Sequence, residues 1–105
     1  MVVAGDFNAK HTAWGAQTSD PRGSRMVELM AAHGLLLLND PCSIPTYETK
    51  YSMSWLDVTL VTPSAIVAGY YWRVLEDVTY AEHRYIEVVI GEETYNFPPG
   101  SNIIN

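Results

Sequence analysis

The sequence has few cysteines and no long hydrophobic run. Cys42 is the single cysteine among 105 residues, so no disulfide can form within the chain and no structural zinc site is expected. This cysteine usage fits a reducing compartment, and we expect an intracellular protein, nuclear or cytoplasmic. The longest apolar run, residues 35–38, is far shorter than the roughly 20 residues that span a bilayer. No membrane-spanning segment is therefore expected.

Positive charge is also scarce. The chain has 6 Lys and Arg residues against 12 Asp and Glu residues, a net charge of −6, which is the opposite of a dedicated nucleic-acid-binding surface. The acidic balance does not exclude a nuclease, because a metal site needs carboxylates and a bound cation reverses the local field. Any contact with nucleic acid must then be local and weak, or must use surface outside these residues.

The chain suits one small α+β domain. Its length and its 48% hydrophobic content allow a modest core and leave no room for two domains. Ser19, Asp20 and Pro21 precede a helical spacing of apolar residues, which predicts a helix over 23–33 that stops at Gly34. Short β-branched or aromatic runs predict strands at 1–4, 46–48, 55–61, 70–75 and 85–90.

Two further segments have less regular patterns. Residues 35–39 are uniformly apolar before Asp40-Pro41, as in a central strand buried on both faces. Residues 93–105 contain Pro98-Pro99-Gly100 and show no periodicity, which predicts a disordered tail.

Three short segments contain candidate catalytic residues. Asp6 and Asn8 follow the first apolar run, and side chains two apart in an extended chain share a face, so this carboxylate and amide can hold one substrate oxygen. A later Asp57 that hydrogen-bonds a later His83 would give the orienting group and general base of a hydrolase. The alternatives are an Asx turn that closes the strand at Asp6, and a solvated loop histidine at His83.

The order of these segments resembles the endonuclease/exonuclease/phosphatase superfamily, and within it the endonuclease domain of insect Jockey-type non-LTR retrotransposons. The matching segments run in register along nearly the whole chain: GDFNAKHTAWG (5–15), LLLLND (35–40), PTY (45–47), SWLDVTLVTP (54–63), WRVLEDVT (72–79) and AEHRYIE (81–87). One such motif alone is a weak signal, whereas all of them in order indicate common ancestry.

The resemblance implies a fold and a domain boundary. Superfamily members form a four-layered α/β sandwich of the DNase I-like type, in which two sheets pack face to face. Residues 1–92 would correspond to its C-terminal half, with one mostly antiparallel sheet and one main helix. One face of that sheet would then be uncovered within this chain.

The resemblance also implies roles for the site residues. His83 would take the proton from the attacking water, and Asp57 would fix its tautomer. Asn8 would position the scissile phosphate, and Asp6 would protonate or stabilise the leaving oxygen, or share a metal. The cofactor would be Mg²⁺ or Mn²⁺. The family's principal metal-binding Glu lies in the first half of the domain and has no counterpart in these residues.

Position 82 departs from the family. The family motif is Ser-Asp-His, whereas this chain has Ala81-Glu82-His83. Because Mg²⁺ demands near-ideal octahedral geometry, the longer arm of Glu82 would have to bind through a water or after a shift of the loop. A tolerated variant and decay of an unused element are about equally consistent with the substitution.

Nucleic-acid contacts are expected from the segment that follows Asn8 and from the loop before Asp57. Lys10 can meet a phosphate, Trp14 can stack on a base or sugar, and Ser54 can reach a phosphate. The alternatives are core packing for Trp14 and a turn-forming role for Ser54.

These expectations define a function and its competitors. The chain is predicted to be part of a metal-dependent DNA endonuclease that nicks target DNA for a reverse transcriptase, and to be inactive without the missing half. Its partners would be DNA, that half and the reverse transcriptase domain. The competitors are a non-catalytic module that binds a partner through the uncovered sheet face, and a small-molecule phosphoesterase of the same superfamily.

Overall fold

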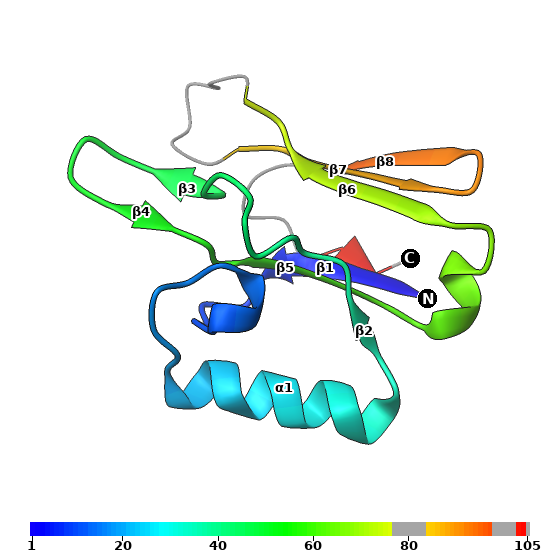
Figure 1. The fold of residues 1–105 in the computed structure, drawn as a ribbon, viewed down its shortest axis with the longest axis horizontal. Coiled ribbons are helices and arrows are strands. Elements are labelled where there is room, and N and C mark those ends of the chain that lie inside the picture. The colour runs from blue at the N-terminus through cyan, green and yellow to red at the C-terminus, as the bar shows by residue number, and fades with distance from the viewer. Residues whose placement is uncertain (77–83, 98–102, 105) are drawn as a thin grey trace.

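The computed structural model describes residues 1–76, 84–97 and 103–104, and it has three layers (Figure 1). Helix α1 (Pro21–His33) covers one face of a sheet with the order β2-β5-β1-β9, and a second sheet, β6-β7-β8, covers the opposite face. A two-stranded hairpin, β3-β4, projects from one end. All strand pairs in these residues are antiparallel.

The bounds of the strands follow. The first sheet consists of β1 (Val2–Asp6), β2 (Leu36–Leu37), β5 (Asp57–Val61) and β9 (Ile103–Ile104). The hairpin consists of β3 (Tyr47–Glu48) and β4 (Met53–Ser54). The second sheet consists of β6 (Tyr70–Val74), β7 (Ile86–Ile90) and β8 (Glu93–Phe97). Two 3₁₀ turns, Thr12–Trp14 and Pro63–Ile66, lie before α1 and after β5.

Strand β5 is buried along its whole length because both of its faces are covered. Val61 packs with residues of β1 and of the second sheet, whereas Val58 and Leu60 pack with Trp14 and the inner side of α1. Since side chains alternate along a strand, Asp57 and Thr59 share the Val61 face, and Trp72 Nε1 of β6 donates to Thr59 Oγ1 at 3.1 Å. The second sheet therefore lies over the carboxylate-bearing face.

Helix α1 ends at His33 as predicted, but it begins at Pro21, two residues before the predicted start at Gly23. Asp20 is its N-cap and accepts from the Gly23 amide, Pro21 occupies the first turn, and Gly34 ends it with a φ of 63°. Leu35 N donates to Met30 O at 2.9 Å, which closes the last turn. Among the described residues, no helix is long and apolar enough to cross a bilayer.

The predicted class, mostly antiparallel strands with one main helix, is confirmed, but the strands divide among three sheets instead of one. The chain covers the expected open face with its own β6-β7-β8 sheet. The predicted central strand at 35–39 is instead the two-residue edge strand β2, and Leu36 is exposed. Beyond β2, the side chain of Asn39 bonds to the backbone of β5 at Asp57 O and Thr59 N.

The predicted tail contains regular structure. Residues Glu93–Phe97 form β8, which pairs with β7 in register from Ile90↔Glu93 to Ile86↔Phe97. Strand β9 pairs with β1 at Val3↔Ile104 and Ala4↔Ile103. In β8 the polar residues Thr94 and Asn96 are exposed and Phe97 is buried. The strand conformation of β8 therefore comes from tertiary pairing.

Candidate functional site

Asp6 and Asp57 meet at one edge of the first sheet. They are directly paired residues of the antiparallel β1–β5 ladder, so their side chains emerge on the same face, with Cβ atoms typically about 4.5–5.5 Å apart. Asp57 is only 4% exposed, whereas Asp6 is half-buried. The fold thus brings together carboxylates from two distant motifs.

Asn8 lies just beyond the end of β1, next to Asp6. Its amide donates to Asp6 Oδ1 at 2.8 Å, an Asx turn, and its φ of 51° lies in the left-handed region. Asn tolerates this region better than most residues. The expected turn is therefore present, and it leaves the Asn8 side chain exposed beside the carboxylates.

The backbone around Asp57 is held by two buried polar side chains. Asn39 Nδ2 donates to Asp57 O, and Asn39 Oδ1 accepts from Thr59 N, both at 2.8 Å. Thr46 Oγ1 accepts from Leu56 N at 3.2 Å and from Asp57 N at 3.5 Å. Buried polar groups that are fully paired rigidify a structure, so these residues hold the backbone of Asp57 in place at this edge of the sheet.

Sequence reasoning did not assign these supporting roles to Asn39 and Thr46. Both lie inside motifs that carry the family likeness, LLLLND and PTY. A signal was present in each case, because a polar residue directly after an apolar run or within a turn is a candidate backbone partner. The partner itself could only be found in three dimensions.

His83 and Glu82 lie outside the described residues, so the predicted general base and the predicted metal ligand remain predictions. The next residue in the sequence, Arg84, is described. Its amide donates to Thr46 O at 2.7 Å and its Nη1 donates to Pro45 O at 2.9 Å. The described chain therefore resumes close to Thr46, the residue that also binds the backbone of Asp57.

The described residues alone do not make a metal centre. Carboxylate oxygens are the ligands that Mg²⁺ prefers, and Asp6 and Asp57 offer two of them. No group of three or more Asp, Glu, His or Cys side chains that could hold an ion occurs within residues 1–76 and 84–97.

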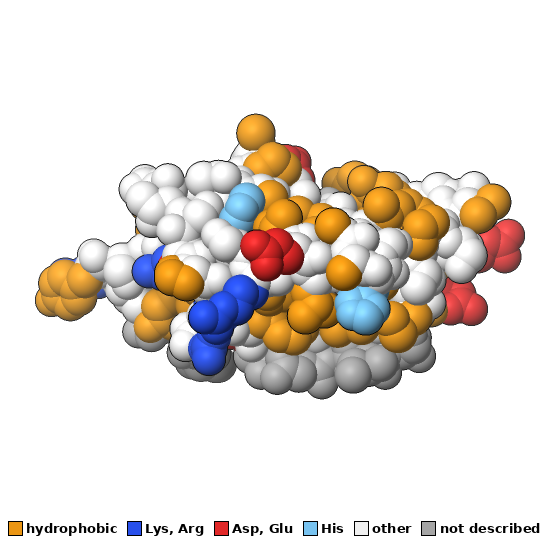
Figure 2. Space-filling view, turned by 90° about the horizontal axis from the view of Figure 1, so that it is seen from below, with side chains coloured by type: hydrophobic (Ala, Val, Ile, Leu, Met, Phe, Trp, Pro, Cys, Tyr) orange, Lys and Arg blue, Asp and Glu red, His pale blue; other side chains and the backbone are white. Residues whose placement is uncertain are grey.

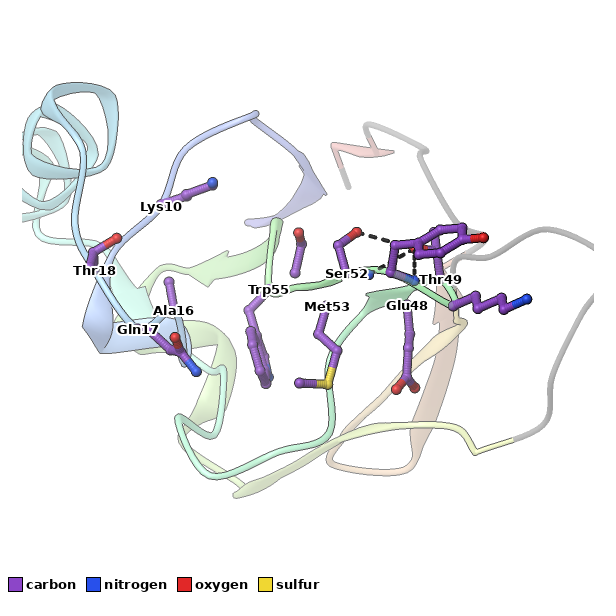
Figure 3. Close-up of a pocket in the computed structure, with 12 residues that line it drawn as sticks. Lys10, Ala16, Gln17, Thr18, Glu48, Thr49, Ser52, Met53 and Trp55 are labelled. Carbon is purple, nitrogen blue, oxygen red and sulfur yellow. Dashed lines mark hydrogen bonds between the residues drawn. The ribbon is translucent and has the colours of Figure 1, made fainter.

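An open cavity of about 520 Å³ lies between the loop after Asn8 and the β3–β4 hairpin. Figure 3 shows Lys10, Gln17 and Thr18 on one side, Glu48 and Met53 on the other, and Trp55 between them. Ser54 also lines the cavity. Two of the three predicted nucleic-acid contacts, Lys10 and Ser54, thus face one hollow, although the contact itself stays a prediction.

The third predicted contact, Trp14, is wrong. Its side chain is fully buried, packs with Ala9, Val58 and Leu60, and donates from Nε1 to Ala9 O at 3.2 Å. A ring that is covered on both faces cannot stack on a base. The alternative of core packing is confirmed.

Sequence reasoning missed the tip of the hairpin. Tyr51 is 87% exposed, and Lys50 Nζ lies 5.7 Å from the centre of its ring. In Figure 2 the matching projection ends in a hydrophobic side chain next to a basic one. An exposed aromatic beside a lysine at a turn was the available signal, because a solvated large aromatic side chain is unusual unless it binds something.

The chain is similar to known proteins in sequence and in fold. Residues 1–87 match the family described as endonuclease-reverse transcriptase. Among solved structures, the fold is similar to the endonuclease domain of TRAS1, a telomere-specific non-LTR retrotransposon, with a TM-score of 0.73 and 30% sequence identity. That match covers 87% of this chain and 42% of the TRAS1 chain, so these residues span less than half of that domain. No curated protein sequence matches.

Proposed function

Because the chain belongs to the endonuclease-reverse transcriptase family, we propose that it supplies the phosphate-binding and proton-transfer side of a DNA endonuclease that nicks target DNA for a reverse transcriptase. The observation that supports this proposal is the direct pairing of Asp6 with Asp57, with Asn8 adjacent. A retrotransposon endonuclease-like domain of this kind would act in the nucleus or cytoplasm.

The proposed reaction is hydrolysis of a phosphodiester by in-line attack of water. His83 takes a proton from the water, whose oxygen bonds to phosphorus. The bond from phosphorus to the leaving oxygen breaks, and that oxygen takes a proton by way of Asp6, which releases a 3′ hydroxyl. Asp57 accepts a hydrogen bond from the other ring nitrogen of His83 and so fixes its tautomer. This role suits a carboxylate that is almost fully buried and whose backbone is held by Asn39 and Thr46.

Asn8 and Asp6 are proposed to act on the substrate oxygens. The exposed Asn8 amide group can donate to a non-bridging phosphate oxygen. Asp6, whose Oδ1 already accepts from Asn8 N, can pass a proton from its other carboxyl oxygen to the leaving oxygen. The Asx turn thereby sets the position of one group relative to the other.

Divalent metals are usual in this family, and Mg²⁺ or Mn²⁺ is the proposed cofactor. A metal would neutralise charge that gathers on the phosphate in the transition state. Asp6, together with Glu82 outside the described residues, is the proposed contribution of this chain. By resemblance to the family, the principal ligand is proposed to be a Glu from the other half of the domain.

DNA is proposed to lie along the side of the molecule that carries the cavity and the hairpin. Lys10 and Lys50 offer phosphate contacts, and Tyr51 offers a face for a base or a sugar edge. With a net charge of −6, binding by these residues alone should be weak and should fall as salt is raised.

A chimera tests the proposal. In it, this chain replaces the matched part of the TRAS1 endonuclease domain, which restores the remainder of the fold. We expect the folded chimera to nick supercoiled plasmid with Mg²⁺, and expect Asp57→Ala or His83→Ala to abolish nicking. The 105 residues alone should nick no faster than buffer, because the first half of the site is absent from them.

Two results would count against the proposal. A folded chimera without nicking, or one whose nicking survives both substitutions, removes the assigned roles. Robust nicking by the 105 residues alone that is lost in Asp57→Ala would instead keep the roles and overturn the proposed dependence on the other half.

The competing functions gain no support from the surface. The outward face of the second sheet presents Tyr71, Arg73, Glu87 and Asn96, a mixed face instead of an apolar one. On the α1 side, hydrophobic, charged and polar side chains are interspersed (Figure 2). The sheet face that a partner-binding module would use is covered by the chain itself.

A further inference from the structure

Arg84 ties the start of β7 to one arm of the projecting hairpin. Besides its bonds to Thr46 O and Pro45 O, its Nη2 lies 2.6 Å from Glu48 Oε1. The Arg84 side chain is only 16% exposed. Hydrogen bonds between two charged groups are about twice as strong as neutral ones. Burial of Arg84 reduces the screening of this pair by salt, although Glu48 is 39% exposed.

The ladder of the hairpin is short. Strands β3 and β4 pair through only two residue pairs, Tyr47↔Ser54 and Glu48↔Met53, and a two-stranded ribbon is marginal by itself. Its base is held where Trp55 Nε1 donates to Ser43 O at 3.0 Å. Glu48 is the outermost residue of β3, so its ion pair acts nearest to the tip.

We propose that Arg84 is a positioning residue: through Glu48 it holds the β3–β4 hairpin at one angle to the body, and so determines how Lys50 and Tyr51 meet DNA. This inference rests on the proposed function. A hairpin that samples several angles is competent for binding only part of the time, and the apparent Kd rises by the inverse of that fraction.

The chain contains a matched control pair. Arg73 and Glu87 form the same kind of bridge, with Nε and Oε1 2.8 Å apart and side chains 51% and 21% exposed. This pair lies on the outward face of the second sheet and joins β6 to β7, which are already paired at five positions. Removing it alters charge by the same amount without releasing the hairpin.

The experiment compares Glu48→Ala with Glu87→Ala. Each substitution removes one negative charge, so charge alone predicts equal or tighter binding of a short DNA duplex by both variants. Positioning predicts the opposite for Glu48→Ala, with an apparent Kd about three- to tenfold higher if the competent fraction falls to about 0.1–0.3. Amide hydrogen exchange over residues 47–54 should speed up in Glu48→Ala and not in Glu87→Ala.

A third variant and a melting curve complete the test. Arg84→Lys keeps the charge but loses the planar fork of guanidinium, so its hairpin exchange should lie between wild type and Glu48→Ala. Circular dichroism melting establishes that each variant is folded. Equal Kd and equal hairpin exchange in Glu48→Ala and Glu87→Ala would overturn the inference.

The outcome also separates this inference from the proposed function. If the wild-type chain binds no DNA even at low salt, the hairpin has no role in DNA binding by this chain. Amide hydrogen exchange alone then decides whether Arg84 anchors the hairpin. Faster exchange only in Glu48→Ala supports the anchor under that outcome, and unchanged exchange removes it.

Discussion

Asp6 and Asp57 are directly opposed in the antiparallel β1–β5 ladder, so two carboxylates share one face of the sheet where the second sheet covers it. Like charges in opposed positions destabilise a strand pair. An arrangement that costs stability is typical of a site kept for chemistry. The pair therefore links the fold to the proposed function.

Neutralising Asp6 should separate stability from activity. Asp6→Asn keeps the oxygen that accepts from Asn8 N and removes the like charge, so the free energy of unfolding should rise by about 0.2–1 kcal/mol, the scale of a cross-strand charge pair. Nicking by the TRAS1 chimera should be lost. Urea unfolding and plasmid nicking provide the two measurements.

Asp40→Asn is the control for that change. Asp40 Oδ1 accepts from Cys42 N at 2.9 Å in a similar turn, and Asp40 lies outside the β1–β5 ladder. This variant should leave stability nearly unchanged. If the free energy of unfolding falls in Asp6→Asn instead of rising, repulsion between the carboxylates is unimportant.

Asn8 gives a second prediction through its backbone. With φ at 51°, Asn8→Ala should cost about 1–2 kcal/mol of stability, whereas Asn8→Gly should be neutral or slightly stabilising. Both variants lose the amide group and should lose nicking in the chimera. At the exposed Asn96 in β8, Gly should instead be less stable than Ala. The same ranking at both positions would argue against a backbone effect.

Local patterns in the sequence were sufficient for most elements. The apolar spacing and the Asp20-Pro21 start predicted α1, and β-branched runs predicted β1, β5 and β6. Strand β8 was missed because its residues acquire strand structure by pairing with β7 across the turn at Gly91, whose φ is 60°. The division into sheets was missed because periodicity shows that a face is buried and not which element covers it.

The candidate site was predicted in part. Motif order placed Asp6, Asn8 and Asp57 in one site, and the ladder register brings them together. Burial was harder to foresee for the aromatic residues: Trp14 is fully buried and Tyr51 is 87% exposed. Which aromatic faces solvent depends on where the hairpin and α1 pack, and no local pattern contains that information.

Gly23 supplies a third prediction, because α1 packs against the loop after Asn8 there. A Cβ at this position would lie 1.9 Å from Lys10 O, a backbone atom that cannot rotate away. Gly23→Ala should therefore destabilise the chain by about 1–3 kcal/mol, although alanine is the better helix former. Ser24→Ala, one residue along at an exposed position, should be neutral or stabilising. If chemical denaturation shows that Gly23→Ala is also stabilising, α1 can move away from Lys10.

Asp20 makes the stability of the contact between α1 and the loop after Asn8 depend on pH. Its Oδ1 accepts from Gly23 N at 2.7 Å and from Lys10 N at 3.2 Å, and these bonds, that from Gly23 foremost, hold the pKa of Asp20 below its ordinary value. A carboxyl whose pKa is lowered by folding stabilises the folded state above its unfolded pKa, and this contribution is lost as pH falls through the folded value. Asp20→Asn keeps a capping oxygen without the charge. The melting temperature of wild type should thus exceed that of Asp20→Asn at pH 6, with the gap closing below about pH 4. A gap that stays constant down to pH 2 would mean that the charge of Asp20 contributes nothing to the cap.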